Sequence, residues 1–205
     1  MTIATFYRVA AGAVFLSLCV STPGAAQTPN SDLDQSAVIR CLSFAGPIPP
    51  DPRTTNDDRI VACTSLIQSS ARGRDLYLVI RGTAYVCKDD FPRALSDFGE
   101  AIRLRPEPGY LIARGRLFLQ LGRLREAISD LDLAVMHLDK LIAANPKPHP
   151  NPQMNQLGKA APLYLRGMSK LRLGDKNGGD RDIADAKLIW DKISDDESVM
   201  KPRCW

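Results

Sequence analysis

The cysteines of this sequence have the type and spacing that most clearly predict a chemical bond. Four of them follow the first 40 residues, at Cys41, Cys63, Cys87 and Cys204. An even number of cysteines in an exported protein favours disulfides, although four cysteines allow three connectivities. We expect Cys41 to pair with Cys63, because the two flank a proline-rich turn between helical stretches, and closing that loop would stabilise the fold by about 3 kcal/mol. Cys87 and Cys204 would then form a second pair or stay as buried thiols.

Patterns for catalysis and metal binding are absent from the sequence. It contains no G-x-S-x-G, H-E-x-x-H or Walker sequence. The two histidines, His137 and His149, lie far from any pattern with metal-ligand spacing. The turn at 174–180 resembles a calcium loop, but Gly179 and Ala186 stand where ligands are needed. We therefore predict neither an enzyme nor a bound metal or cofactor.

The charge of the chain does not favour a nucleic-acid partner. The net charge is +4, and removal of residues 1–26, which contain Arg8 and no other charged residue, would lower it by one to +3. Six arginines fall between Arg103 and Arg125, but they are interleaved with glutamates, which is typical of a solvated helix face.

The first residues have the pattern of a secretory signal peptide. Arg8 precedes an uncharged apolar run at 9–20, and small residues follow at 21–26. We expect cleavage after Ala26. The apolar run is too short for a transmembrane helix, which needs about 20 residues. A lipid anchor on Cys19 is disfavoured, because a bulky leucine precedes that cysteine. We therefore expect a periplasmic or secreted chain with no stable membrane insertion after cleavage.

Internal repeats organise the rest of the chain. The dipeptide Arg-Gly occurs at corresponding positions of three segments: Arg81-Gly82, Arg114-Gly115 and Arg166-Gly167. Further along each segment an aspartate precedes an alanine by four residues: Asp97 and Ala101, Asp130 and Ala134, and Asp182 and Ala186. Each unit therefore predicts two helices joined by a short turn. Because the aspartates share one repeat position, we expect them to pair with a neighbouring arginine on the helix surface and not to form active sites.

The small residues of each unit have a packing role. Two antiparallel helices approach closely only where small side chains meet, and in the first unit Gly82 and Ala94 would supply that contact. The large residues Tyr85 and Phe98 would fill the space beside it, and Pro106 would end the second helix.

These positions resemble the tetratricopeptide repeat (TPR) family. Residues 75–107 match its order of bulky residue, glycine, aromatic, alanine, aromatic, alanine and proline nearly in full. Residues 108–141 match well. Residues 160–193 match weakly, because Lys170 replaces the aromatic residue and Gly179 replaces the alanine. The resemblance implies an all-α fold, a short TPR-like α-solenoid of antiparallel helix pairs with an N-terminal helical cap.

The spacing of the repeats predicts an insertion. The Arg-Gly glycines lie 33 residues apart and then 52 residues apart, and residues 145–152 of the longer interval contain four prolines, which exclude a helix. We expect the second helix of repeat 2 to extend to about Ala144, and helices near 32–42 and 57–67 to cap the array. The predicted order is signal peptide 1–26, helical cap with a half repeat 27–74, TPR 1 75–107, TPR 2 108–144, proline-rich loop 145–159, degenerate TPR 3 160–194, and tail 195–205.

The resemblance also implies a binding face, because the first helix of each pair lines the concave side of a TPR array. The residues expected there are Val79, Thr83, Val86, Ile112, Arg116, Leu119, Gln120, Tyr164, Met168 and Arg172. This face is mostly apolar. We expect it to bind an extended peptide or an amphipathic helix of a protein in the cell envelope, with the arginines meeting carboxylates.

Three alternatives to this function stay open. The same face is equally well explained as core that is covered by the chain's own tail, tied to the face by a Cys87–Cys204 disulfide. The chain would otherwise bind a small ligand or an envelope polymer, or serve as an accessory subunit of an envelope enzyme.

Overall fold

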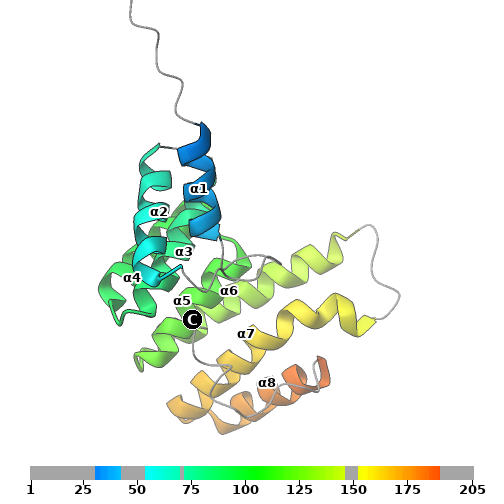
Figure 1. The fold of residues 1–205 in the computed structure, drawn as a ribbon. Coiled ribbons are helices and arrows are strands. Elements are labelled where there is room, and N and C mark those ends of the chain that lie inside the picture. The colour runs from blue at the N-terminus through cyan, green and yellow to red at the C-terminus, as the bar shows by residue number, and fades with distance from the viewer. Residues whose placement is uncertain (1–30, 43–53, 70–71, 146–151, 190–205) are drawn as a thin grey trace, which may run out of the picture.

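The computed structural model of the chain describes residues 31–42, 54–69, 72–145 and 152–189 (Figure 1). Within these residues the fold is all-α, as predicted, with eight helices and no strand. The helices are α1 (Ser31–Leu42), α2 (Asn56–Ser69), α3 (Arg74–Val86), α4 (Phe91–Leu104), α5 (Pro108–Gln120), α6 (Leu124–Ala143), α7 (Pro152–Leu173) and α8 (Lys176–Ile189). The predicted signal peptide and the tail at 195–205 lie outside the described residues.

The helices form a stack of neighbouring pairs, which is a solenoid-like arrangement. The helices within the pairs α1–α2, α3–α4, α5–α6 and α7–α8 pack on each other, and α2, α4 and α6 pack on the first helix of the following pair. In Figure 1 the α1–α2 pair lies at the top of the stack and the α7–α8 pair at the bottom. The first helices also contact one another, α1 with α3, α3 with α5 and α5 with α7, so that they form a continuous layer.

The turns inside the three repeated pairs share one backbone feature. Asp89, Gly122 and Gly174 all have a positive φ, of 58°, 72° and 96°. They occupy the same repeat position, because their spacings of 33 and 52 residues equal those of the Arg-Gly dipeptides. Glycine adopts this left-handed conformation without a steric cost, and aspartate tolerates it better than most residues. The backbone therefore reverses in the same way in each pair.

The glycines of the Arg-Gly dipeptides lie where the paired helices approach most closely. A Cβ atom on Gly82 would lie 2.8 Å from the Phe98 ring, and one on Gly115 would lie 3.0 Å from Leu131. A Cβ atom on Gly167 would lie 2.8 Å from Ile183. The packing role predicted for this position is therefore present in all three pairs, since any larger residue would push the second helix away.

The loop after the second repeat is shorter than predicted. The second helix of that repeat, α6, ends at Ala143, close to the expected end. However, α7 already begins at Pro152, so that residues 152–159, predicted as loop, are helical. The prediction was wrong because a proline is well tolerated at the first position of a helix, where its missing N–H is not needed.

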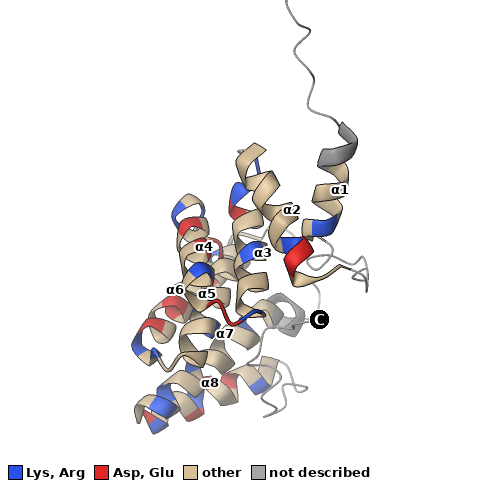
Figure 2. Cartoon of the chain, turned by 60° about the vertical axis from the view of Figure 1, so that its left-hand side comes forward, with Lys and Arg blue, Asp and Glu red and all other residues tan. Residues whose placement is uncertain are grey.

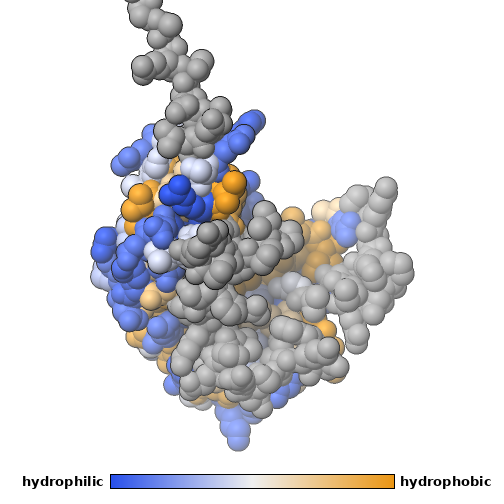
Figure 3. Space-filling model, viewed as in Figure 1, coloured by the Kyte–Doolittle hydropathy of each residue, from blue (hydrophilic) through white to orange (hydrophobic). Residues whose placement is uncertain are grey.

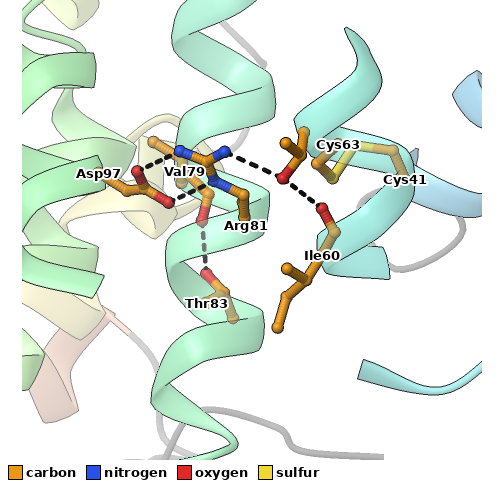
Figure 4. The surroundings of a disulfide bond; sticks show 8 residues. Cys41, Ile60, Cys63, Val79, Arg81, Thr83 and Asp97 are labelled. Carbon is orange, nitrogen blue, oxygen red and sulfur yellow. Dashed lines mark hydrogen bonds and ion pairs between the residues drawn. A yellow bond between two sulfur atoms is a disulfide. The ribbon is translucent and has the colours of Figure 1, made fainter. Parts of the chain in front are cut away.

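The predicted disulfide joins the two helices of the N-terminal cap. Cys41 of α1 and Cys63 of α2 are joined, with their Cα atoms 5.1 Å apart (Figure 4). Both cysteines are fully buried and pack with Leu66 and with Ile80 of α3. A 12-residue helix is marginal by itself in water. The cross-link and this cluster therefore hold α1 on the stack.

Candidate interaction face

The ten residues predicted for the binding face all lie on α3, α5 and α7, three of the four helices of the continuous layer. Two of them, Gln120 and Arg172, are exposed. Five are half-buried: Val79, Thr83, Ile112, Arg116 and Met168. The remaining three are buried: Val86, Leu119 and Tyr164. Seven of the ten predicted residues therefore reach solvent at least in part.

The three buried residues belong to the hydrophobic core. Val86 packs in the cluster of Tyr85 and Phe98, and only 6% of it is exposed. Leu119 is 1% exposed, in the cluster at the α5–α6 interface, and Tyr164 is 2% exposed, in the cluster between α6, α7 and α8. Their contribution to the protein is packing, and they are not available to a partner in this conformation.

The half-buried residues already have contacts within the fold. The hydroxyl of Thr83 donates a hydrogen bond of 2.9 Å to the carbonyl oxygen of Val79, one turn earlier in α3. The side chain of Arg116 is engaged as well. Gln120 and Arg172 are consequently the two predicted residues whose polar ends are most accessible to another molecule.

Cys87 lies at the C-terminal end of α3, beside this layer, and it is disulfide-bonded. Because Cys41 and Cys63 bond to each other, the partner of Cys87 lies outside the described residues. Cys204, the predicted partner, also lies outside the described residues, so the Cys87–Cys204 pairing stays a prediction.

Three buried ion pairs join the helices of the repeated pairs. The guanidinium groups of Arg81, Arg114 and Arg166 each donate two hydrogen bonds to an aspartate, with distances of 2.6 to 2.9 Å. Their partners are Asp97, Asp130 and Asp182. Pairing with an arginine was predicted, but the predicted surface location was wrong, since these aspartates are only 4 to 5% exposed. The glycine beside each arginine allows the close approach that buries the pair.

Two of these arginines also bridge to the preceding pair. The Nη1 atom of Arg81 donates a hydrogen bond of 3.0 Å to the Thr64 hydroxyl of α2, while the same side chain binds Asp97 of α4 (Figure 4). The Nη1 atom of Arg166 binds Asp132 of α6 at 2.8 Å. Each of these arginines therefore joins three helices, which ties one repeat to the next.

The third pair has an additional cation. Lys170 of α7 lies 2.8 Å from an Oδ2 atom of Asp182, which already binds Arg166. Burial by itself raises the pKa of Asp182, but the hydrogen bonds from Arg166 and Lys170 outweigh burial and lower this pKa below its usual value. Asp182 is therefore held as a carboxylate with a structural role.

The first two pairs place an aromatic ring at the position that Lys170 takes in the third. The Tyr85 ring lies near two guanidinium groups, with the carbon of Arg93 4.6 Å from the ring centroid and that of Arg81 5.9 Å away. The Phe118 ring has the same arrangement with Arg123 at 4.4 Å and Arg114 at 5.6 Å. Arg81 and Arg114 therefore each take part in a buried ion pair and in a cation–π contact.

A further buried cluster was not predicted from the sequence. The Asp75 carboxylate of α3 accepts hydrogen bonds of 2.8 Å from Arg105 Nε, which follows α4, and from the Tyr110 hydroxyl of α5. Burial and the nearby carboxylate raise the pKa of Tyr110 to about 12. Burial opposes the ionisation of Asp75, but the bonds from Tyr110 and Arg105 lower the pKa of this carboxyl group. These residues lie 30 and 35 positions apart, and no repeated motif links them.

Basic and acidic residues are interspersed along α4, α6 and α8 (Figure 2). Within the described ranges, no three His, Cys, Asp or Glu side chains are grouped so that they could hold a metal ion. No helix in that part of the chain combines the length and the apolar character needed to cross a bilayer.

No protein family model, curated protein or solved structure matches this chain.

Proposed function

We propose that this chain is an exported TPR-type interaction module that binds a protein or peptide partner of the cell envelope through the layer of α3, α5 and α7. The proposal combines the resemblance of residues 75–107 and 108–141 to the TPR pattern with an arrangement of paired helices that suits such a repeat. Arrays of this kind present the first helix of each pair to a ligand.

The observation that carries the proposal is that some polar side chains are used inside the fold while others are exposed. Asp97, Asp130 and Asp182, which could do chemistry, are committed to arginines inside the helix interfaces. In contrast, Gln120 and Arg172 extend from the α3–α5–α7 layer into solvent. The same helices carry half-buried apolar residues, Val79, Ile112 and Met168, and a combination of apolar and polar side chains is what a peptide-binding surface needs.

Export is supported by the disulfide chemistry. Cys41 and Cys63 form a disulfide, which fits an oxidising compartment. The predicted signal peptide at 1–26 supports the same compartment, and a periplasmic or secreted location is our proposal.

The proposal is tested by affinity capture from an envelope extract with the wild-type chain and the double variant Gln120→Lys/Arg172→Glu. Both positions are exposed, so the variant should fold normally. We expect the captured protein to be lost, or its affinity to fall by about tenfold or more with purified components. Leu119→Asp is unsuitable as a test, because Leu119 is 1% exposed and a charge there would unfold the core.

The matched control is Arg125→Glu, which changes an exposed arginine on α6, outside the layer. It should leave capture unchanged. Capture that is insensitive to the double variant would remove the site from this layer. Capture of an envelope polymer in place of a protein would establish the small-ligand or polymer alternative.

The layer has a second candidate occupant, the chain's own C-terminal tail. Cys87 is disulfide-bonded at the end of α3, and a bond to Cys204 would bring the tail to this layer. Non-reducing peptide mapping tests this pairing. A Cys87 peptide linked to the peptide that contains Cys204 is expected, and a link to any other cysteine would exclude the tail as the tethered occupant.

A further inference from the structure

A hollow of about 420 Å³ lies between the α4–α5 turn, the first residue of α5 and the end of α6. The turn contributes residues 105–107, α5 contributes only Pro108, and α6 and its C-cap contribute His137, Lys140, Leu141 and Ala144. This volume is within the range of sites that bind small molecules or anchor a large side chain.

The walls of the hollow are fixed by the fold. Arg105 is bonded to the buried carboxylate of Asp75, which also binds Tyr110. On the opposite wall, Nδ1 of His137 lies 2.9 Å from the carbonyl oxygen of Pro106. Two prolines stiffen the turn, and Pro108 is buried. The hollow therefore exists before any ligand arrives, so that a ligand does not have to order it.

Exposed apolar side chains lie on the helices that border the hollow. Nine large hydrophobic side chains are exposed among the described residues, and four of them lie on α6 or at the end of α4. These four are Leu104, Leu133, Met136 and Leu141, which are 40 to 57% exposed. Figure 3 shows hydrophobic residues gathered along the last turns of α6.

Six residues in the C-terminal half of α6 and at its C-cap form one stripe. They follow each other at alternating intervals of three and one residues, which places them on one face of the helix: Leu133, Met136, His137, Lys140, Leu141 and Ala144. The stripe spans 12 residues, or about 17 Å at the rise of an α-helix. Exposed apolar stripes of this kind, rimmed by polar residues, mark interaction sites.

The charges of the site indicate the chemistry of its partner. Arg105 and Glu107 both line the hollow, but their charges already meet, with 3.6 Å between Arg105 Nε and Glu107 Oε1, and Arg105 also binds Asp75. Lys140 is exposed and forms no ion pair with a described residue. A second copy of the site would bring only a glutamate that Arg105 already binds, whereas an acidic group on a different protein would supply an unpaired counter-charge to Lys140.

We propose that the hollow and the α6 stripe form a second docking site for a protein partner, whose contacting segment is an acidic amphipathic helix. A large apolar residue of that helix would enter the hollow, its apolar face would cover the stripe, and a carboxylate beside the anchor would meet Lys140. This site is distinct from the α3–α5–α7 layer and goes beyond the function proposed for that layer.

The test uses the full chain and two synthetic 16-residue peptides with a fluorescent label. The probe has leucines and one central tryptophan on a single helical face and glutamates on the flanks. The control peptide has the same composition in an order that removes the common apolar face. We expect fluorescence anisotropy at about 0.15 M salt to show binding of the probe that is roughly tenfold tighter than that of the control.

Variants locate the binding. Leu141→Arg should weaken probe binding by about tenfold, and Lys140→Glu by about fivefold. Matched controls are Leu188→Arg, at a leucine of α8 that is 74% exposed, and Arg125→Glu. Both controls should leave probe binding unchanged. Because Leu141 is 57% exposed, its variant should keep the wild-type melting temperature.

Several results would overturn the proposal. They are the absence of probe binding up to about millimolar concentration, equal binding of the two peptides, or binding that Leu141→Arg does not change. If the chain bound neutral phospholipid vesicles as tightly as the probe peptide, and Leu141→Arg abolished that binding, the site would be a membrane contact instead. The double variant Gln120→Lys/Arg172→Glu should not affect probe binding, so that failure of this site and failure of the α3–α5–α7 layer are distinguished.

Discussion

The pairs α3–α4 and α5–α6 differ from the pair α7–α8 in one of the side-chain contacts that hold their two helices together. All three contain the Arg-Gly dipeptide and a buried aspartate that binds the arginine through two hydrogen bonds. The first two pairs place an aromatic ring between two arginines, whereas the third has Lys170 bonded to Asp182. The comparison teaches that the glycine and the ion pair define the helix interface, while the flanking contact can be apolar or ionic.

The backbones also approach more closely in the third pair. A Cβ atom on Gly167 would meet the carbonyl oxygen of Gly179 at 2.9 Å, whereas one on Gly82 would lie 3.3 Å from that of Ala94. Gly179 itself has no room for a Cβ atom, which would lie 2.6 Å from Leu171. The glycine at position 179, where the other two pairs have Ala94 and Ala127, is therefore required for the closer approach of α7 and α8.

The largest difference between the pairs should follow from removing the buried aspartate. Asp182→Ala removes the shared partner of two cations, of which Arg166 keeps Asp132 whereas Lys170 keeps no carboxylate among the described residues. Asp130→Ala removes the partner of one cation, Arg114. Because an uncompensated buried charge is costly and the first variant affects two cations, we expect losses of about 4 kcal/mol for the first and about 3 kcal/mol for the second in urea unfolding. An equal or larger loss at Asp130 would contradict the additional role of the lysine.

Alanine at the repeated glycines should give the next largest difference. In Gly167→Ala the new methyl group meets a backbone oxygen, which cannot move without displacing α8, and we expect a loss of about 2 kcal/mol. In Gly115→Ala the nearest atom is Leu131 Cγ at 3.0 Å, and leucine can adjust. The gain in helix propensity, about 1 kcal/mol, should then offset most of the strain. Thermal unfolding monitored by circular dichroism distinguishes the two, and similar values would show that the third pair is no tighter than the second.

Lys170→Met should have a smaller effect, about 1 kcal/mol, because it removes one of the two cations on Asp182 and keeps the length of the side chain. It should also raise the pKa of Asp182, which NMR titration of the carboxyl carbon measures. Lys176→Met, at an exposed lysine of α8, is the control and should change neither quantity. An unchanged pKa of Asp182 would show that the lysine contributes only packing.

The smallest effect concerns acid stability. The pKa of Asp182 is lowered in the folded chain, so the unfolded chain takes up its proton first as the pH falls. The stability that the carboxylate contributes is complete well above 3.8, its ordinary pKa, and is lost as the pH falls through the lower folded value. The difference in unfolding free energy between the wild type and Asp182→Asn should therefore shrink below about pH 4. A difference that stays constant down to pH 2.5 would exclude this linkage.

Several elements could be predicted from the sequence because they depend on neighbouring residues or on repetition. The paired helices, the close approach at Gly82 and the extension of α6 all follow from periodicity and from small residues at fixed spacing. The Cys41–Cys63 disulfide follows from two helices separated by a short loop. The pairing of Asp97 with an arginine follows from the shared repeat position.

Other features depend on distances that the sequence does not contain. The burial of Val86, Leu119 and Tyr164 removes three of the ten predicted contact residues from solvent, because neighbouring helices cover them. The Asp75–Arg105–Tyr110 cluster joins side chains from three elements. Because a long arginine side chain can reach several elements, the sequence does not indicate which carboxylate it binds.

The sequence by itself determined that this chain forms repeated helix pairs and where their glycines must lie, and it favoured the cysteine pair that closes the cap. These properties are local, since helical period, turn chemistry and the lack of a side chain act over a few residues. Only the tertiary structure decided that the arginine–aspartate pairs are buried, that Lys170 replaces an aromatic contact with an ionic one, and that a hollow remains beside α6. Those outcomes depend on how closely the backbones approach, because that separation sets which side chains are desolvated and which partners they can reach.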